Sequence, residues 1–132
     1  MSVLLRTKSN CGRKLRGSEV ELHRLWLVYT KRAKDKHRTW SLTPEQFKVF
    51  LLGNCYYCGS KPSQKRLDHR GNRPPFLYNG IDRIDSSQGY EYHNIVTCCG
   101  FCNRAKSVYP VQEFLDYIQQ LVHYRANLTS SR

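Results

Sequence analysis

The sequence predicts an α+β fold in which helices flank a short central β-hairpin. Two apolar segments, residues 78–84 and 94–98, indicate the hairpin, because they are separated by a run of turn residues. Apolar side chains that recur every three or four residues on both sides of this region indicate the flanking helices. Two Cys-x-x-Cys pairs frame the hairpin, one before it and one after it.

Two helices are predicted before the hairpin. The first begins at Ser18, because Ser18-Glu19-Val20-Glu21 has the form of a capping box and a helical apolar stripe follows it. The second begins after Thr43, where Thr43-Pro44-Glu45-Gln46 combines a cap, an early proline and a glutamine at the box position, and Gly53 ends it. We expect Trp26 and Trp40 in the core rather than on a binding surface.

The strands of the hairpin are expected at Tyr78–Ile84 and Asn94–Cys98, with Gly89-Tyr90 in the loop between them. A short helix is predicted near Cys102. A final helix follows Ser107, and its apolar stripe is expected to pack in the core. The stripe consists of Val111, Phe114, Leu115, Ile118, Leu121 and Val122.

Length and charge limit the classes of function. The 132 residues suit a basic arm at residues 1–17 and one domain at 18–132, whose cysteine-framed core spans 42–122. The formal net charge is +12, and residues 1–40 carry 11 Lys and Arg against 3 acids. This balance favours a polyanionic partner, above all nucleic acid. No apolar run of membrane length and no signal-peptide pattern is present, so we expect neither a membrane span nor secretion.

Four of the six cysteines have the spacing of a structural zinc site, in which two thiolates from each pair complete a tetrahedral sphere. Redox dithiols are the alternative, but no thioredoxin-like βαβ pattern supports them. A zinc thiolate site implies a reducing compartment, and therefore an intracellular location such as the cytoplasm, nucleoid or nucleus. The remaining two cysteines, Cys11 and Cys98, are expected to be free thiols. The ligands would be Cys55, Cys58, Cys99 and Cys102.

The segments between and after the cysteine pairs resemble the HNH (ββα-metal, or His-Me finger) nucleases. The resemblance covers residues 42–122 and rests on Asn79-Gly80-Ile81-Asp82-Arg83, His93-Asn94-Ile95-Val96 and Cys99-Gly100-Phe101-Cys102-Asn103. The best match is a subgroup with Asp-Arg where most members have Asp-His or His-His, and it includes a restriction enzyme and phage, viral and mobile-element proteins. The resemblance implies a zinc-stapled ββα-metal domain that hydrolyses phosphodiester bonds in DNA with a divalent metal ion.

By this resemblance Asp82 and Asn103 hold a catalytic Mg²⁺ or Mn²⁺, for which carboxylate and amide oxygens are suitable ligands. Asn94 corresponds to a residue that fixes the hairpin loop by hydrogen bonds. Arg83 stands where most members have the histidine that activates water. Because arginine stays protonated, Arg83 cannot be a base and is expected to clamp the phosphate. The base is then expected elsewhere, with His37 first and His69, His93, Tyr56 and Tyr57 as further candidates.

Eight basic side chains are expected to contact nucleic acid, with a solvated surface as the alternative for each. They lie at the end of the first helix, in the long connection 61–79, and on the short helix. That connection is expected to be either a DNA-contacting loop or a passive insertion. The eight are Lys31, Arg32, Lys34, Lys36, Arg70, Arg73, Arg104 and Lys106.

The sequence thus predicts a metal-dependent HNH endonuclease that acts on DNA. One alternative is an inactive zinc-containing module that binds DNA or RNA, in which Arg83 marks lost catalysis. Another is a protein-interaction module within a larger assembly. A plasmid-nicking assay separates the endonuclease from the inactive module. A protein-interaction module should show no salt-dependent affinity for DNA, unlike the other two. Whether the chain forms a homodimer is left open.

Overall fold

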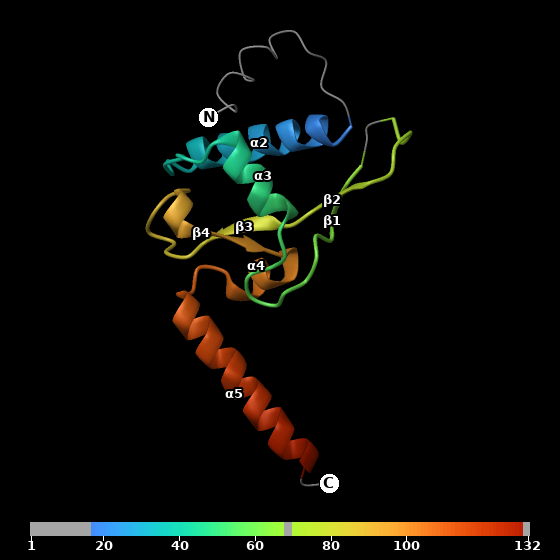
Figure 1. The fold of residues 1–132 in the computed structure, drawn as a ribbon. Coiled ribbons are helices and arrows are strands. Elements are labelled where there is room, and N and C mark those ends of the chain that lie inside the picture. Colours follow the sequence, from blue (N-terminus) through green and yellow to red (C-terminus); the bar gives the residue numbers. More distant parts are fainter. Residues whose placement is uncertain (1–16, 68–69, 131–132) are drawn as a thin grey trace, which may run out of the picture.

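The computed structural model describes residues 17–67 and 70–130 and has the predicted α+β fold (Figure 1). A two-stranded hairpin lies at the centre, two helices lie on one side of it, and a short helix lies on the other (Figure 1). The last helix extends away from this body. The helices are α2 (Ser18–Asp35), α3 (Pro44–Leu52), α4 (Gly100–Lys106) and α5 (Val111–Ser130), with a 3₁₀ turn η1 (Tyr92–Asn94). The strands are β1 (Gln64–Arg66), β2 (Phe76–Tyr78), β3 (Gly80–Arg83) and β4 (Ile95–Cys98).

The central hairpin pairs β3 with β4 in an antiparallel register that decides which side chains share a face. Ile81 lies opposite Thr97, and Asp82 lies opposite Val96. Because side chains alternate along a strand, Ile81 and Arg83 point to one face and Asp82 to the other. The side chains of Asp82 and Arg83, which the resemblance placed in one site, therefore lie on different sides of the sheet.

The face of Ile81 packs against α2 and α3 in a core rich in aromatic rings. Trp26 and Trp40 meet edge to face with ring centroids 5.3 Å apart, and both rings contact Phe47. The prediction that both tryptophans belong to the core is confirmed. The buried apolar residues of this core are Leu25, Leu42, Phe47, Leu51, Ile81 and Ile95.

The two predicted helix starts have different outcomes. At α3 the capping box is present: Thr43 and Gln46 exchange side-chain and backbone hydrogen bonds, and Gly53 is the C-cap, as predicted. At α2 the predicted box is wrong, because the N-cap is Gly17 and it makes no side-chain cap bond. Glu21 is instead buried, and its carboxylate accepts bonds of 2.9 Å from Arg24 and from Arg66 of β1. A tertiary ion pair has replaced the local cap.

The connection 61–79 is not a simple loop. It folds back on itself as the antiparallel pair β1–β2, in which Gln64 lies opposite Tyr78 and Arg66 opposite Phe76. The predicted first strand of the central hairpin, Tyr78–Ile84, therefore began too early, because Tyr78 belongs to β2 and β3 begins at Gly80. The aromatic rings of Phe76 and Tyr78 stack 6.2 Å apart.

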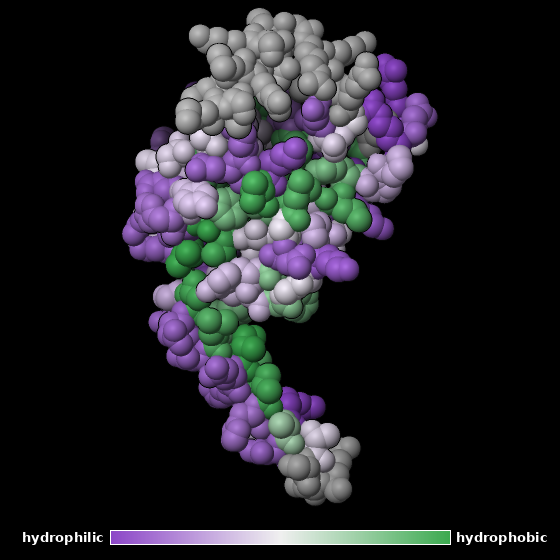
Figure 2. All heavy atoms as spheres, viewed as in Figure 1, coloured by the Kyte–Doolittle hydropathy of each residue, from purple (hydrophilic) through white to green (hydrophobic). Residues whose placement is uncertain are grey.

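The prediction that the stripe of α5 packs in the core is wrong for most of its length. Phe114 is buried, with 8% of its surface exposed, and its ring lies 5.5 Å from that of Tyr57. Leu115 is half-buried, and from Tyr117 onward the large apolar side chains are exposed, so that a hydrophobic band follows the helix outward (Figure 2). Helical periodicity identified an amphipathic helix correctly, but it could not show what covers the apolar face.

Some predictions fall outside the described residues. Residues 1–16 of the basic arm, with Cys11, lie there, and so does His69. Among the helices of the described chain, none combines the length and hydropathy that crossing a membrane requires.

Candidate functional site

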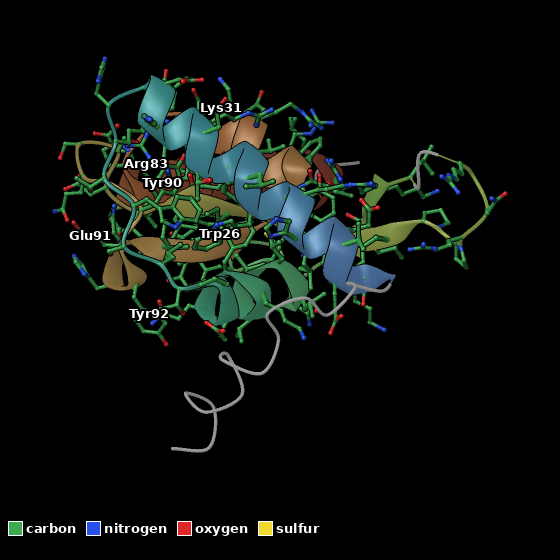
Figure 3. The ribbon with its side chains drawn as sticks, turned by 90° about the horizontal axis from the view of Figure 1, so that it is seen from above. Trp26, Lys31, Arg83, Tyr90, Glu91 and Tyr92 are labelled. Atoms are coloured by element: carbon green, nitrogen blue, oxygen red, sulfur yellow. The ribbon has the colours of Figure 1, made fainter. Side chains whose placement is uncertain are left out.

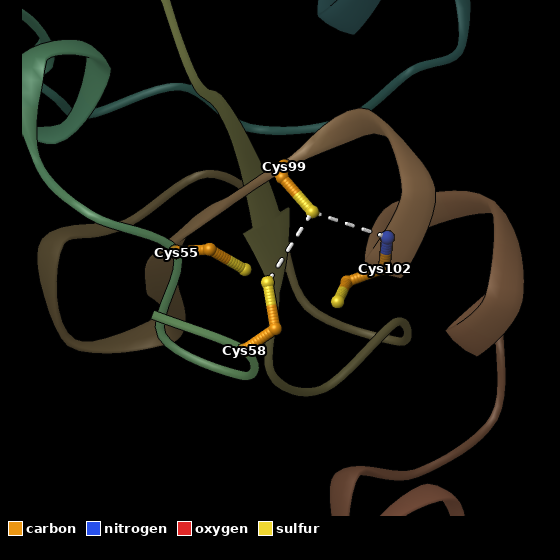
Figure 4. Close-up of side chains that lie close together, drawn as sticks. All are labelled: Cys55, Cys58, Cys99 and Cys102. Atoms are coloured by element: carbon orange, nitrogen blue, oxygen red, sulfur yellow. Dashed lines mark hydrogen bonds between the residues drawn. The ribbon is translucent and has the colours of Figure 1, made fainter. Parts of the chain in front are cut away.

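The two Cys-x-x-Cys pairs meet in one cluster (Figure 4). The first pair precedes the long connection, and the second begins where β4 ends and α4 starts. All four sulfur atoms lie within 4.8 Å of one another, and Sγ of Cys58 is 3.7 Å from Sγ of Cys99. Four thiolates at about 2.3 Å from a tetrahedral ion would lie about 3.8 Å apart. The cluster of Cys55, Cys58, Cys99 and Cys102 therefore has the chemistry and the dimensions to hold one structural zinc ion.

Hydrogen bonds favour the thiolate at two of the four cysteines, Cys58 and Cys99, whereas burial, and secondly a hydrogen bond with Cys99, raises the pKa of Cys102. The backbone N–H of Cys102 donates to Sγ of Cys99 over 3.4 Å (Figure 4). Hydrogen bonding to the side chain and then the backbone of Ser60 lowers the pKa of Cys58 to about 6. Because metals bind the thiolate, such bonds support ligation.

Cys98 is adjacent to the cluster but is not among its four members. Its side chain is fully buried, and its Sγ donates to the carbonyl of Cys99 over 3.4 Å. Burial, and secondly the charge of Asp82, raises the pKa of Cys98 well above that of an ordinary thiol. It therefore behaves as a small buried apolar residue.

Asp82 is the centre of a buried polar cluster on the cysteine side of the hairpin. Its Oδ2 accepts a 2.7 Å hydrogen bond from the hydroxyl of Tyr57 and lies 3.1 Å from Nζ of Lys106. The carboxylate is almost fully buried and the lysine is completely buried, so this ion pair is shielded from water. Among the described residues, Oδ1 of Asp82 has no hydrogen-bond partner. One carboxylate oxygen is thus held by the protein and the second is available.

Tyr57 links this cluster to the first cysteine pair. Burial, and secondly its bond to Asp82, raises the pKa of Tyr57 far above that of an ordinary phenol. Its hydroxyl is therefore a hydrogen-bond donor to the carboxylate at neutral pH. Its ring is held edge to face by Phe114, so the hydroxyl is aimed by packing.

Asn103 lies on α4 one turn before Lys106. Residues three apart share a helix face, and Nζ of Lys106 touches Asp82, so Asn103 lies on the side of α4 nearer β3. Its side chain is exposed and makes no hydrogen bond within the described residues. A carboxylate oxygen and an amide oxygen suit a hard ion such as Mg²⁺, which commonly takes one or two protein ligands and fills its sphere with water. The donor chemistry at Asp82 and Asn103 fits such an ion.

Arg83 points to the opposite face of the hairpin and holds the loop that follows. Its Nη1 donates to the carbonyls of Ser86 and Gln88 over 2.6 and 2.9 Å, and its guanidinium carbon lies 5.5 Å from the centre of the Tyr90 ring (Figure 3). Nε and Nη2 have no acceptor among the described residues. The guanidinium is therefore anchored along one edge and retains free donors along its second edge.

His37 shares a polar hollow with Arg83. It follows α2 in a left-handed conformation, with φ of 53°, and is exposed. The hollow has a volume of about 330 Å³ and is lined also by Arg38 and the loop 86–89. The structure thus brings His37 to Arg83 but shows no contact between His37 and Asp82. His93 and Tyr56, which the sequence also offers as a base, are exposed and do not contact Asp82.

Asn94 fixes the loop between the two strands. Its side-chain nitrogen donates to the carbonyls of Asp85 and Gly89, and its oxygen accepts from the backbone N–H of Asp85 over 2.9 Å. The carboxylate of Asp85 caps the turn by accepting hydrogen bonds from the hydroxyl and the backbone N–H of Ser87. These two bonds lower the pKa of Asp85. Asp85 therefore has a structural role in the turn.

The expected nucleic-acid contacts divide into exposed and buried residues. Lys106 does not present its charge to solvent, because its ammonium is buried against Asp82 and the carbonyl of Arg83. The expectation of a surface contact there needs correction. No local pattern in the sequence signals this pairing, since 24 positions separate the two partners, although Lys106 shares a helix face with Asn103. The exposed candidates are Lys31, Arg32, Lys34, Lys36, Arg70, Arg73 and Arg104.

Comparisons with known proteins agree with this geometry. No family model matches the sequence. A protein of Acanthamoeba polyphaga mimivirus, uncharacterized protein R423, is 30% identical over 99 residues, and the match covers 75% of this chain but 16% of that protein. The solved structure of the rare-cutting HNH restriction endonuclease PacI is similar with a TM-score of 0.58 and 25% identity, over 88% of this chain and 94% of that chain. The fold is HNH-like.

Proposed function

We propose that this protein is a metal-dependent HNH endonuclease that hydrolyses phosphodiester bonds in DNA. The observation that carries the proposal is the HNH-like fold, which extends over 88% of the chain and is shared with a restriction endonuclease that perturbs DNA. The net charge of +12 suits a polyanionic substrate. We further propose that the cysteine cluster binds one structural zinc ion and that the protein acts inside the cell, where thiolates remain reduced.

The catalytic ion proposed for this site is Mg²⁺ or Mn²⁺. Asp82 and Asn103 would hold it, and it would polarise the phosphate and stabilise the leaving 3′ oxygen. Tyr57 and Lys106 hold Oδ2 of Asp82 and so orient Oδ1. Arg83 would bind a phosphate oxygen with the donors that the loop does not use.

For the base we retain His37. The support is its position, because the imidazole and the Arg83 guanidinium line the same hollow. Tyr57 is the competing candidate, since it contacts Asp82 directly. We assign Tyr57 the role of positioning Asp82.

Nicking of supercoiled plasmid DNA in the presence of Mg²⁺ or Mn²⁺ tests the proposal. Asp82→Asn and Asn103→Ala should abolish nicking and preserve DNA affinity, because each removes an ion ligand and neither removes an exposed cation. Asp82→Asn keeps an acceptor for Tyr57, and thermal melts should verify that it folds. Glu45→Ala and Asn54→Ala are matched controls that should cut at the normal rate. Normal cutting by Asp82→Asn would refute the ion site.

Two substitutions separate the candidates for the base. His37→Ala should remove most of the nicking rate while DNA affinity is retained, because it removes the proposed proton acceptor. Tyr57→Phe should lower the rate less, since Asp82 keeps its ion pair with Lys106. A greater loss in Tyr57→Phe than in His37→Ala would transfer the role of base to Tyr57.

A second function is favoured by two specific contacts. The carboxylate of Asp82 is already neutralised by Lys106, and Arg83 is bonded to loop carbonyls, as expected for an inactive module that binds DNA or RNA. Such a module would bind nucleic acid with an affinity that falls steeply with salt and would show no nicking with either ion.

A further inference from the structure

Helix α5 carries an apolar surface that the described part of the chain leaves uncovered. From Tyr117 onward the exposed fractions of its large apolar side chains range from 38% at Ile118 to 64% at Val122. The helix extends away from the body of the domain (Figure 1), and the band of hydrophobic side chains follows it outward (Figure 2). A surface helix of a monomer normally turns such a stripe towards its own core.

The apolar side chains form one continuous surface. Phe114, Ile118, Leu121 and Leu128 are spaced four, three and seven residues apart, so they share a helix face. At the base of α5 this face widens into a groove of about 640 Å³. The groove is lined by Phe101 and Ala105 of α4, by Tyr109, and by Glu113, Tyr117 and Leu121 of α5.

The surface is large enough for a stable interface. A specific interface buries about 800 Å² per partner. Phe101, Tyr109, Tyr117 and Tyr124 are each 57% to 75% exposed. Since an aromatic side chain can bury about 150 to 250 Å², these four alone offer roughly 500 Å². Ile118, Leu121, Val122 and Leu128 contribute the remainder.

The charges of α5 indicate its partner. Its acidic residues, Glu113 and Asp116, lie near the start of the helix, and its one Lys or Arg, Arg125, lies near the end. Arg125 falls on the apolar face, seven residues after Ile118 and three before Leu128. Glu113 lines the groove at the opposite end. Two antiparallel copies would bring Arg125 of each towards Glu113 of its partner and would also oppose the helix dipoles, whereas a parallel pair would place like charges together.

We propose that α5 is the interface between two copies of this chain, which pair antiparallel about a two-fold axis. The distal half of each stripe fills the groove of the partner copy. Such an interface is self-complementary, as a two-fold axis requires.

Sedimentation equilibrium of the full chain between about 1 and 100 μM tests the proposal, since this range brackets micromolar association. The chain should be dimeric, and Ile118→Glu with Leu121→Glu should weaken dimerisation by about 100-fold or more, because both lie at the centre of the surface. Val49→Glu on α3, which replaces a side chain that is 72% exposed elsewhere, is the matched control and should not alter the mass. A monomeric wild-type chain, or a dimer that tolerates both substitutions, would overturn the proposal and leave the stripe for a different protein or another segment.

The orientation has its own test. Glu113→Arg and Arg125→Glu should each weaken the dimer, and the double variant should restore it, because the antiparallel pair is rebuilt with the signs exchanged. Circular dichroism should be unchanged for every variant, since all of the altered side chains are exposed. If both single variants dimerise as strongly as the wild-type chain, the antiparallel arrangement is refuted.

Discussion

One face of the β3–β4 hairpin packs against aromatic rings, whereas the opposite face carries a buried ion pair beside four thiols. On the first face Ile81 contacts a core of apolar residues from α2 and α3. On the second face, Asp82 is held by Tyr57 and Lys106, and Cys98 packs against the cysteine cluster. The two faces therefore respond to different perturbations, although they belong to the same eight residues.

The difference between the two faces shows that Asp82 and Arg83, although adjacent in the sequence, are held in place by different kinds of contact. Asp82 is fixed by charge and by groups that lie far away in the chain, so its geometry depends on the cysteine side. Arg83 is fixed by backbone carbonyls of its own loop and by Tyr90, so its geometry is local. Four predictions, from the largest expected effect to the smallest, test this division.

The largest effect is expected from the cysteine cluster. Cys102→Ala should abolish zinc binding and cooperative unfolding, because structural zinc in small domains provides on the order of 10 kcal/mol. Zinc content per chain and thermal melts measure this. Cys98→Ala, a buried cysteine outside the cluster, is the control and should cost only about 1 to 3 kcal/mol with zinc retained. Folded wild-type protein without zinc would contradict the prediction.

The next effect concerns the buried ion pair. Lys106→Met should destabilise the protein by about 3 to 5 kcal/mol, because it leaves a buried carboxylate unpaired. Combining it with Asp82→Asn should recover much of that loss, and chemical denaturation of the four proteins gives the coupling free energy. The exposed pair Lys31–Asp35, with N to O of 2.6 Å, is the control, and Lys31→Met should change stability by less than about 1 kcal/mol. Additive losses at Lys106 and Asp82 would show that the pair does not couple.

A smaller effect on stability is expected on the aromatic face. Arg83→Ala removes two hydrogen bonds to the loop and should cost about 1 to 3 kcal/mol. If Arg83 also binds phosphate, Arg83→Ala should lower the nicking rate by the same factor at every pH from about 6 to 9, because arginine stays protonated throughout this range. Arg83→Lys should recover part of the rate, since a point charge cannot reproduce a planar donor. Arg70→Ala, exposed on the β1–β2 tip, should leave stability unchanged. Normal nicking by Arg83→Ala would limit Arg83 to supporting the loop.

The smallest effect is a pH dependence on the same face. Burial, and secondly the proximity of Tyr78, raises the pKa of Tyr29 from 10.0 to about 12. Because the folded state retains this proton, the stabilisation is complete below pH 10 and disappears as the pH rises towards 12. Denaturation at pH 9, 10 and 11 should show a loss of about 1 to 2 kcal/mol that Tyr29→Phe reduces. An identical loss in Tyr29→Phe would assign the effect to different groups.

Much of the fold could be predicted from local signals. The box at Thr43 and the stop at Gly53 depend on neighbouring residues, and both are present. The cysteine pairs could be placed in one cluster because their spacing alone is typical of a metal site. The hairpin was placed correctly to within two residues at each end, since its strands are apolar and bounded by turn residues.

Features that depend on distant partners could not be predicted in this way. Ser18 does not cap α2 because Glu21 bonds to Arg66, which lies 45 residues later. The β1–β2 hairpin was missed because Gln64-Lys65-Arg66 lacks the apolar alternation of a strand. In the candidate site, the contacts of Tyr57 and Lys106 with Asp82 cross 25 and 24 positions. The chemical roles proposed for His37, Asp82, Arg83 and Asn103 remain predictions, whereas the loop contacts of Asn94 are present.

The cysteine cluster also has a consequence for how the chain can vary. With an ion bound, it joins residues 55–58 to residues 99–102 and closes everything between them into a loop. The β1–β2 hairpin lies inside this loop, and its tip carries Arg70 and Arg73 on the surface. Doubling the length of a closed flexible loop costs only about 0.6 kcal/mol. A change in the length or the charges of the tip should therefore have little effect on the stability of the fold, and Asp82 should keep its place.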